Sequence, residues 1–203
     1  MVKGFTDQEK EMIMTKLIEE GKQQFVAMGV KKTSIAQLTK AAGIAQGSFY
    51  QFFSSKEELF FNILELEEAQ IKQKLLEKIN VHHMTRQSFK EMLLYSIELI
   101  EEHQLVKTLF DREDFERIVR KLPQETMEEH IKRDEDVLEP LLKLWQQNGF
   151  LVKKDPKVIT GAIRGFFTML LHKKEIGEEL FPEVVELLAE SLAAGLVEGR
   201  SLS

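Results

Sequence analysis

Short and polar side chains gather between residues 46 and 51, and they are of the kinds that bind base edges and phosphates. They are Gln46, Gly47, Ser48, Tyr50 and Gln51. Amide and hydroxyl groups form hydrogen bonds with bases in the major groove of DNA and with backbone phosphates. The segment therefore indicates a surface that binds nucleic acid.

Two short helical patterns, over residues 34–42 and 45–52, must position these side chains, with Gly43 between them. A helix-turn-helix needs a glycine where the chain turns with positive φ, and apolar residues where its two helices meet. Five positions of the unit are apolar as required, and they are Leu38, Ala42, Ile44, Phe49 and Phe52. Thr39, where alanine is usual, is the one departure. An ordinary helical hairpin is the alternative, but the five matched positions favour a DNA-binding unit.

The charge distribution points to the same end of the chain. The net charge is −6, yet residues 1–56 hold eight lysines against five acidic residues, which gives +3, so the remainder carries −9. A polyanion would be attracted to the first quarter of the chain and repelled by the rest.

Helical patterns continue through the rest of the sequence, which has only four prolines. We expect a first helix over 6–28, capped by Thr6 with Glu9 and ended by Gly29, and a long helix over 55–79. Further helices are predicted over 86–103, 105–110, 112–121, 124–147, 156–174 and 182–198. The fold class is all-α, with a three-helix headpiece over 1–54 and a helical body over 55–203.

Several functional classes have no support in the sequence. It contains no cysteine, no stretch like a signal peptide and no apolar run of the roughly 20 residues that span a bilayer. The five histidines form no HExxH pair, and no GxSxG, P-loop or GxGxxG motif occurs. We expect no catalytic residue, metal or cofactor, no membrane partner, and a cytoplasmic location.

The N-terminal quarter resembles the TetR (tetracycline-repressor-like) family of bacterial transcriptional regulators, over about residues 8–60. The matching residues are Phe25-x3-Gly29, Thr33-Ser34-Ile35, Ala41-Ala42-Gly43-Ile44, Gly47-x2-Tyr50-x-Phe52-Phe53 and Lys56-Glu57-Glu58-Leu59. The resemblance implies that Gln46, Gly47, Ser48 and Gln51 face the major groove of operator DNA. It also implies that Tyr50, Lys56, Thr33 and Ser34 hold phosphates. Two features depart from the family pattern: Ala45 replaces a capping Ser or Thr, and the recognition helix lacks arginine.

The resemblance further implies a homodimer, formed by the helices over 156–174 and 182–198. Their broad apolar faces support this, because such a surface would be exposed in a monomer. The predicted interface residues are Ile163, Phe167, Leu188, Leu192, Ala193 and Leu196. The alternative is that these residues form the core of a single chain.

A ligand pocket in the helical body is also implied by the resemblance. Its candidate lining residues are Met92, Tyr95, Leu99, Phe110, Phe115, Trp145, Phe166 and Met169. Their Phe and Met content suggests an apolar effector, although each residue taken singly is more often part of a packed core. The predicted function is a repressor that an apolar small molecule releases from its operator. The alternatives are a DNA-binding protein that recruits a protein partner, and a helical enzyme or carrier.

Overall fold

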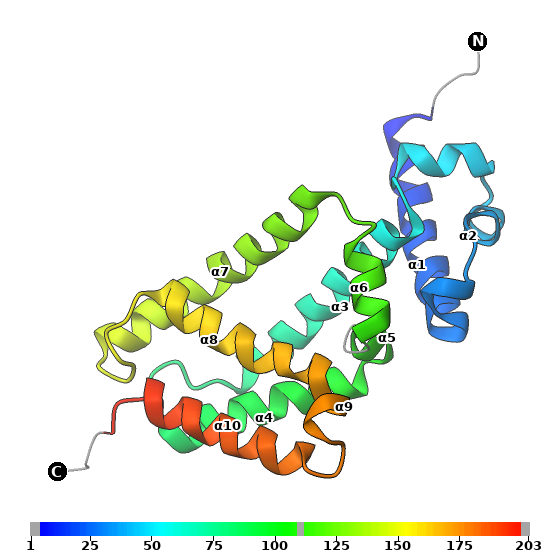
Figure 1. The fold of residues 1–203 in the computed structure, drawn as a ribbon. Helices are drawn as coiled ribbons and strands as arrows, with labels where there is room; N and C mark the ends of the chain where they lie inside the picture. Colours follow the sequence, from blue (N-terminus) through cyan, green and yellow to red (C-terminus); the bar gives the residue numbers. More distant parts are fainter. Residues whose placement is uncertain (1–4, 109–111, 200–203) are drawn as a thin grey trace. The chain divides into compact units, whose positions relative to one another are not determined.

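The computed structural model describes residues 5–108 and 112–199, most of which lie in helices (Figure 1). Within these two ranges, one isolated antiparallel bridge, Leu151 with Val197, is the only β pairing. The predicted all-α class is confirmed. Contacts divide the chain into two compact units, Met1–Gln70 with His103–Pro123, and Ile71–Glu102 with Gln124–Ser203.

The first unit begins with α1 (Asp7–Lys32). Thr6 caps this helix, and Glu9 completes the predicted capping box: each side chain binds the other residue's backbone N–H. Gly29, at φ 74° and ψ 164°, interrupts the helix as expected. The chain then resumes a helical turn as far as Lys32, so α1 reaches four residues beyond the predicted end.

The remaining helices of the first unit are α2 (Ile35–Ala42), the 3-10 helix η1 (Gln46–Gln51), the first part of α3 (Lys56–Lys78), α5 (Gln104–Thr108) and α6 (Arg112–Val119). Packing of α1 against α3 requires Gly21. A Cβ at this position would lie 2.9 Å from Cδ1 of Ile63 and 3.2 Å from Cδ2 of Leu59. Phe25 packs edge-on against Phe60, with ring centroids 5.2 Å apart.

The first unit is therefore larger than the headpiece predicted over residues 1–54. It also holds the beginning of α3 together with α5 and α6, while residues 71–78 of α3 belong to the second unit. The division at residue 54 delimits the helix-turn-helix motif and stays a proposal.

The second unit contains α4 (Arg86–Glu102), α7 (Gln124–Gln147), α8 (Pro156–Thr168), the 3-10 helix η2 (Met169–His172), α9 (Lys173–Ile176) and α10 (Phe181–Leu196). In Figure 1, α10 runs alongside α4, and α8 packs on α7. Phe89 and Leu93 of α4 and Ala189 and Ala193 of α10 are all buried. Lys90 of α4 donates to Glu186 of α10 at 2.9 Å, and this hydrogen bond raises the pKa of Lys90.

The single helix predicted over 156–174 is wrong, because the structure divides this range into α8, η2 and α9. The chain tightens into η2 after Thr168 and leaves helical geometry at His172, with φ −110° and ψ 19°, before α9 begins. The helix predicted over 124–147 matches α7, and Pro140 lies inside it.

The end of α10 is held by segments far away in the sequence. Val152 N–H donates to the Leu196 carbonyl at 2.9 Å, and Glu198 N–H donates to the Phe150 carbonyl at 2.9 Å. Arg86 Nε donates to the Val197 carbonyl at 3.1 Å. The loop after α7 and the beginning of α4 thus fix where α10 ends.

Candidate nucleic-acid interface

The helix-turn-helix consists of α2, a turn at Gly43 and η1. Ser34 caps α2 in a second capping box, in which its hydroxyl and the Gln37 side chain bind each other's backbone N–H. Gly43 ends the helix at φ 75°, a left-handed conformation that favours glycine. The helix predicted over 45–52 is a 3-10 helix, so its existence is confirmed and its type is new.

The inner side of the motif is packed as the spacing predicts. Leu38 and Phe49 are fully buried, Ala42 is 4% exposed, and Ile44 and Phe52 are half-buried. Thr39 is buried among them, and its hydroxyl donates to the Ile35 carbonyl at 2.9 Å. A threonine therefore fits where alanine is usual, because its one polar atom is satisfied inside α2.

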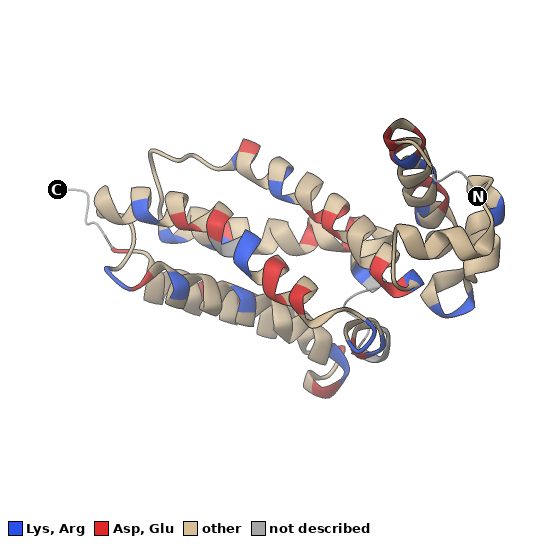
Figure 2. Cartoon of the chain, turned by 90° about the horizontal axis from the view of Figure 1, so that it is seen from above, with Lys and Arg blue, Asp and Glu red and all other residues tan. Residues whose placement is uncertain are grey.

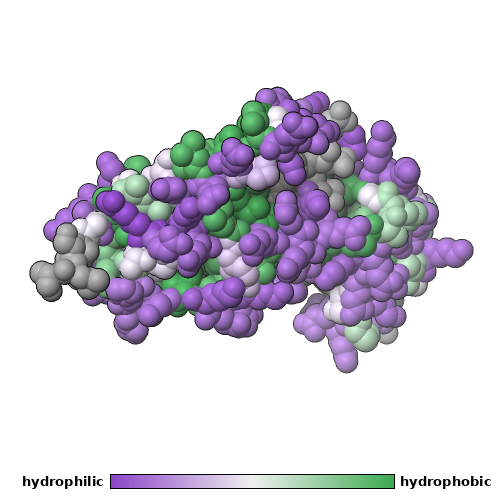
Figure 3. Space-filling view, turned by 90° about the horizontal axis from the view of Figure 1, so that it is seen from below, coloured by the Kyte–Doolittle hydropathy of each residue, from purple (hydrophilic) through white to green (hydrophobic). Residues whose placement is uncertain are grey.

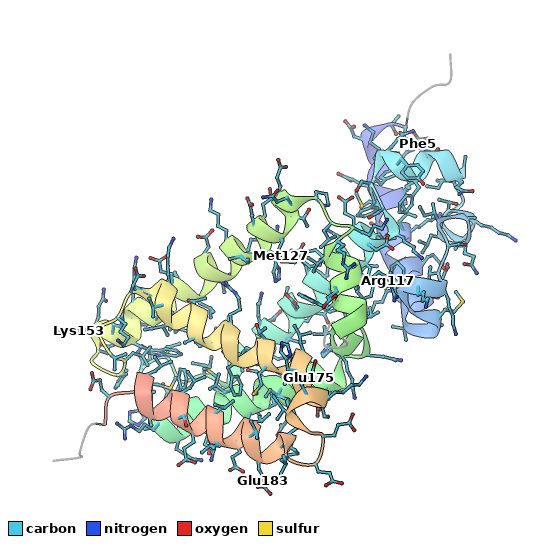
Figure 4. The ribbon with its side chains drawn as sticks, in the orientation of Figure 1. Phe5, Arg117, Met127, Lys153, Glu175 and Glu183 are labelled. Carbon is cyan, nitrogen blue, oxygen red and sulfur yellow. The ribbon has the colours of Figure 1, made fainter. Side chains whose placement is uncertain are left out.

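The N-terminus of α1 reaches the same motif. The rings of Phe5, labelled in Figure 4, and Phe52 lie 6.1 Å apart between centroids. Phe49 of η1 packs against Phe53, with ring centroids 5.9 Å apart. Aromatic contacts thus hold η1 and the residues that follow it.

The outward side of η1 presents the side chains expected to face DNA. Gln46, Gly47 and Gln51 are exposed, Tyr50 is 59% exposed, and Ser48 is half-buried. Ala45, at the N-cap, makes no side-chain cap, as its residue type dictates. Both α1 and α3 contain basic and acidic residues, which Figure 2 colours blue and red, whereas η1 has no charged residue. Recognition by η1 would therefore use hydrogen bonds of neutral groups.

The residues expected to hold phosphates differ in whether their side chains are exposed and able to donate a hydrogen bond. Ser34 is exposed, whereas Thr33 is 1% exposed and its hydroxyl donates to the Gly29 carbonyl at 2.9 Å. Thr33 therefore offers no side-chain donor to a ligand. The first N–H groups of α2 lack intrahelical partners and point toward the Ser34 end.

Lys56 has its ammonium group directed into the protein. Its Nζ lies 2.6 Å from the Val30 carbonyl oxygen, 3.2 Å from that of Lys31 and 2.6 Å from that of Thr33. The cation therefore sits at the C-terminal end of α1, where carbonyl groups lack intrahelical partners.

Comparison with known proteins agrees with this motif. A family model described as "Bacterial regulatory proteins, tetR family" matches residues 17–63, from α1 through η1 into α3. Residues 17–63 therefore belong to the tetR family of DNA-binding motifs. With this motif, and with transcriptional regulators as its relatives, the chain is a DNA-binding transcriptional regulator and not an enzyme.

Individual relatives extend the likeness beyond the motif. The regulator is 35% identical over 66 residues to the HTH-type transcriptional regulator AcrR of Shigella flexneri, a match that covers 32% of this chain and 31% of AcrR. It is 26% identical over 159 residues to the probable acrEF/envCD operon repressor of Escherichia coli K12, covering 75% of this chain and 71% of that protein. The first match thus spans less than a third of its relative.

Solved structures share the fold of the whole chain. SmeT, the repressor of the Stenotrophomonas maltophilia multidrug efflux pump SmeDEF, aligns with a TM-score of 0.60 at 20% identity, over 92% of this chain and 91% of SmeT. A putative TetR-family regulator from Syntrophomonas wolfei aligns with a TM-score of 0.62 at 18% identity, over 94% and 100% of the two chains. Headpiece and body therefore both have counterparts in solved structures.

A buried carboxylate in the first unit of this regulator was not predicted from the sequence. Glu67 of α3 is 7% exposed, and its Oε1 accepts from Lys22 Nζ of α1 at 2.6 Å. Its Oε2 lies 3.4 Å from Nδ1 of His103. The sequence signal for this buried position was the helical spacing of Glu67, four residues from each of the apolar residues Ile63 and Ile71.

The candidate pocket residues fall into three groups. Six belong to the second unit: Leu99, Trp145 and Phe166 are buried, and Met92, Tyr95 and Met169 are half-buried. Trp145 Nε1 donates to the Val81 carbonyl at 3.2 Å, and Lys78 Nζ lies 3.4 Å from the centre of the Tyr95 ring. Phe115 belongs to the first unit, and Phe110 lies outside the described residues.

The candidate interface residues divide by burial within one chain. Ala193 is 1% exposed and Leu196 is 7% exposed, so both pack against their own chain. Leu188 is 39% exposed, while Ile163, Phe167 and Leu192 are half-buried. Two further leucines that were not in the predicted set are more exposed, Leu187 of α10 at 63% and Leu180, the N-cap of α10, at 60%.

Among the described residues, no group of three or more His, Asp or Glu side chains is arranged to hold a metal ion. No described helix is long and apolar enough to cross a membrane.

Proposed function

We propose that this protein is a homodimeric repressor that binds a specific operator through η1 and is released from it by an apolar small molecule. One observation carries the proposal: polar, uncharged side chains are exposed on η1 while Phe49, on its inner face, is fully buried. Such an arrangement holds hydrogen-bonding groups in fixed positions, which base recognition needs. We infer that this occurs in the cytoplasm, where the chromosome lies.

Within the interface, we propose that Gln46, Gly47, Ser48 and Gln51 contact base edges. Tyr50 and Ser34, with the first N–H groups of α2, are proposed to bind phosphates. Because glutamine can bind adenine with two hydrogen bonds, Gln46 and Gln51 are the residues most suited to discriminate between bases.

The dimer is supported by the exposed apolar side of α10 and the small residues of α8. Leu180, Leu187 and Leu188 repeat at helical spacing and are all exposed. On α8, Gly161 and Gly165 are exposed, and a Cβ at either would meet no atom within 4 Å. Glycines four residues apart let a second helix approach closely, and Figure 3 shows apolar residues at the surface between hydrophilic ones. We therefore place the partner copy on α8 and α10.

Release by an effector is proposed to act through α3, which supplies residues to both units. The named function of SmeT, a repressor of a multidrug efflux pump, supports an apolar small molecule as effector. Linkage requires the effector to bind the DNA-incompetent state more tightly by the factor that it weakens operator binding. A tenfold effect requires about 1.4 kcal/mol, so a few changed contacts around Leu99, Trp145 and Phe166 would suffice.

Selection of duplexes from a random DNA library by the purified protein tests the proposal. We expect enrichment of a palindrome whose half-sites lie about one helical turn, roughly 34–36 Å, apart. Absence of any enriched sequence would overturn specific DNA binding. The selected operator then allows fatty acyl compounds, flavonoids and cationic dyes to be screened for release, with Trp145 fluorescence as the binding signal. If no small molecule binds, release by a protein partner becomes the better explanation.

A further inference from the structure

The ammonium group of Lys56 is held by three backbone carbonyl oxygens. As the first residue of α3, Lys56 reaches back to the last turn of α1 and its C-cap, and its Nζ contacts the carbonyl oxygens of Val30, Lys31 and Thr33. A lysine ammonium has three N–H donors and no acceptor. Three carbonyl partners at 2.6–3.2 Å therefore use its whole donor capacity.

The three carbonyls also need this cation. They belong to the end of α1 and the residue after it, where carbonyls lack intrahelical partners and the helix dipole is negative. If the ammonium turned outward to a phosphate, at least one of the two 2.6 Å contacts would be lost. A phosphate contact would therefore cost this junction at least one of its internal contacts.

We infer that Lys56 is a positioning residue for DNA binding and not a phosphate ligand. It holds the segment 30–33 against the first turn of α3, and the next residue, Ser34, is the N-cap of α2. The orientation of α2, and through Gly43 that of η1, then depends on the Lys56 contacts. This inference rests on the proposed operator binding and reverses the role that the family resemblance implied for Lys56.

Neighbouring contacts show that the same junction is held from both sides. The Thr33 hydroxyl donates to the Gly29 carbonyl at 2.9 Å, which holds the end of α1. At the beginning of α3, Ser55 Oγ accepts from Glu58 N–H at 3.1 Å, and Ser54 N–H donates to the Glu58 carboxylate at 2.6 Å. The contacts of Lys56 link the end of α1 to the beginning of α3.

Lys56→Met, which keeps the length of the side chain and removes its charge, tests the assignment through the salt dependence of operator binding. Each lost phosphate contact lowers the slope of log K against log[salt] by about 0.9. We expect operator affinity to fall about tenfold or more, the slope to stay as in the wild type, and the melting temperature without DNA to fall. Lys32→Met, at an exposed position at the same end of α1, is the control, with an unchanged melting temperature. A slope lower by about 0.9 at an unchanged melting temperature would overturn the inference.

A second measurement needs neither a variant nor DNA. Limited acetylation of the wild-type protein, followed by mass spectrometry, compares the reaction rates of individual lysines. We expect Lys56 to react at least tenfold more slowly than Lys32 and Lys40, which are exposed, because its ammonium is hydrogen-bonded to three carbonyls. Equal rates would refute the internal contacts. Because this readout does not involve DNA, it separates failure of the Lys56 inference from failure of the proposed function.

Discussion

Two regions depart, in opposite directions, from the rule that apolar residues lie inside a protein and polar residues outside. The first is the helix-turn-helix with the residues before it, and the second is α8 together with α10 and its N-cap. In the first region, Thr33 and Thr39 are buried, and each donates its hydroxyl to a backbone carbonyl. In the second region, Leu180, Leu187 and Val158 are exposed at about 60%. A buried polar group with a partner is complete within one chain, whereas an exposed apolar face gains only when another surface covers it.

Two arginine substitutions six residues apart on α10 are expected to have the largest effects. Ala193→Arg places a charge in a seam that is already closed within one chain, so we expect unfolding of the second unit, at a cost above about 4 kcal/mol. Leu187→Arg lies on the exposed side, so we expect a folded protein that no longer dimerises. Circular dichroism and sedimentation velocity distinguish the two results.

Val137→Arg is the matched control, because Val137 is also exposed, at 51%, but lies on α7. We expect it to remain folded and dimeric. If Leu187→Arg sedimented as a dimer like this control, the partner copy would not lie on the exposed side of α10.

Two neighbouring aromatic residues of the helix-turn-helix differ in burial. Phe49 is fully buried, so Phe49→Ala should destabilise the first unit by about 3–5 kcal/mol. Tyr50 is exposed, so Tyr50→Ala should leave the melting temperature nearly unchanged and weaken binding to all DNA sequences alike. Thermal unfolding and operator titration separate these effects. Equal loss of stability in both variants would contradict the observed division between inner and outer faces.

The buried carboxylate of Glu67 offers a smaller effect in the same unit. Glu67→Gln removes the charge that accepts from Lys22, and we expect a loss of about 1–3 kcal/mol, because Lys22 remains partly exposed and can be hydrated. A double-mutant cycle with Lys22→Met isolates the interaction energy of the pair. Additive effects of the two substitutions would mean that the pair contributes nothing to holding α1 against α3.

The smallest expected effect concerns the capping box of α1. The pKa of Glu9 lies below its ordinary value of 4.5 because its carboxylate accepts hydrogen bonds from the backbone N–H and the hydroxyl of Thr6. A lowered folded-state pKa gives stability that is present in full above pH 4.5 and is lost as the pH falls through the lower value. Glu9→Gln should therefore lower the melting temperature slightly at pH 7, and the difference should disappear in acid. A difference that persisted at low pH would exclude the charge as its cause.

Local features of the first region could be predicted from the sequence, because their partners lie within a few residues. Both the capping box of Thr6 with Glu9 and the turn at Gly43 follow from residue type and short spacing. Lys56 could not be assigned in this way, since its partners lie 23–26 residues away in the chain. The same limit applies to Glu67, which meets residues 45 and 36 positions distant.

Periodicity was less informative on α10, for a different physical reason. An apolar stripe shows that a helix face leaves water, but it does not say whether the covering surface belongs to the same chain. Ala193 and Leu196 prove to be covered by their own chain, whereas Leu187, on the opposite side, is not. Only the burial of individual residues within one chain separates the two cases.

The contact of α10 with α4 has a consequence for the order in which the protein folds during synthesis. All residues of the first unit have been translated once Pro123 has left the ribosome, whereas the second unit needs α10, whose end binds Arg86 across 111 positions. Contacts between residues so far apart in sequence form late, because a long loop must close first. We therefore expect the first unit, which contains the helix-turn-helix, to fold on the ribosome while the chain still lacks the surface proposed to bind a second copy. Pairing of two chains would then follow release, at a rate set by the concentration of finished protein.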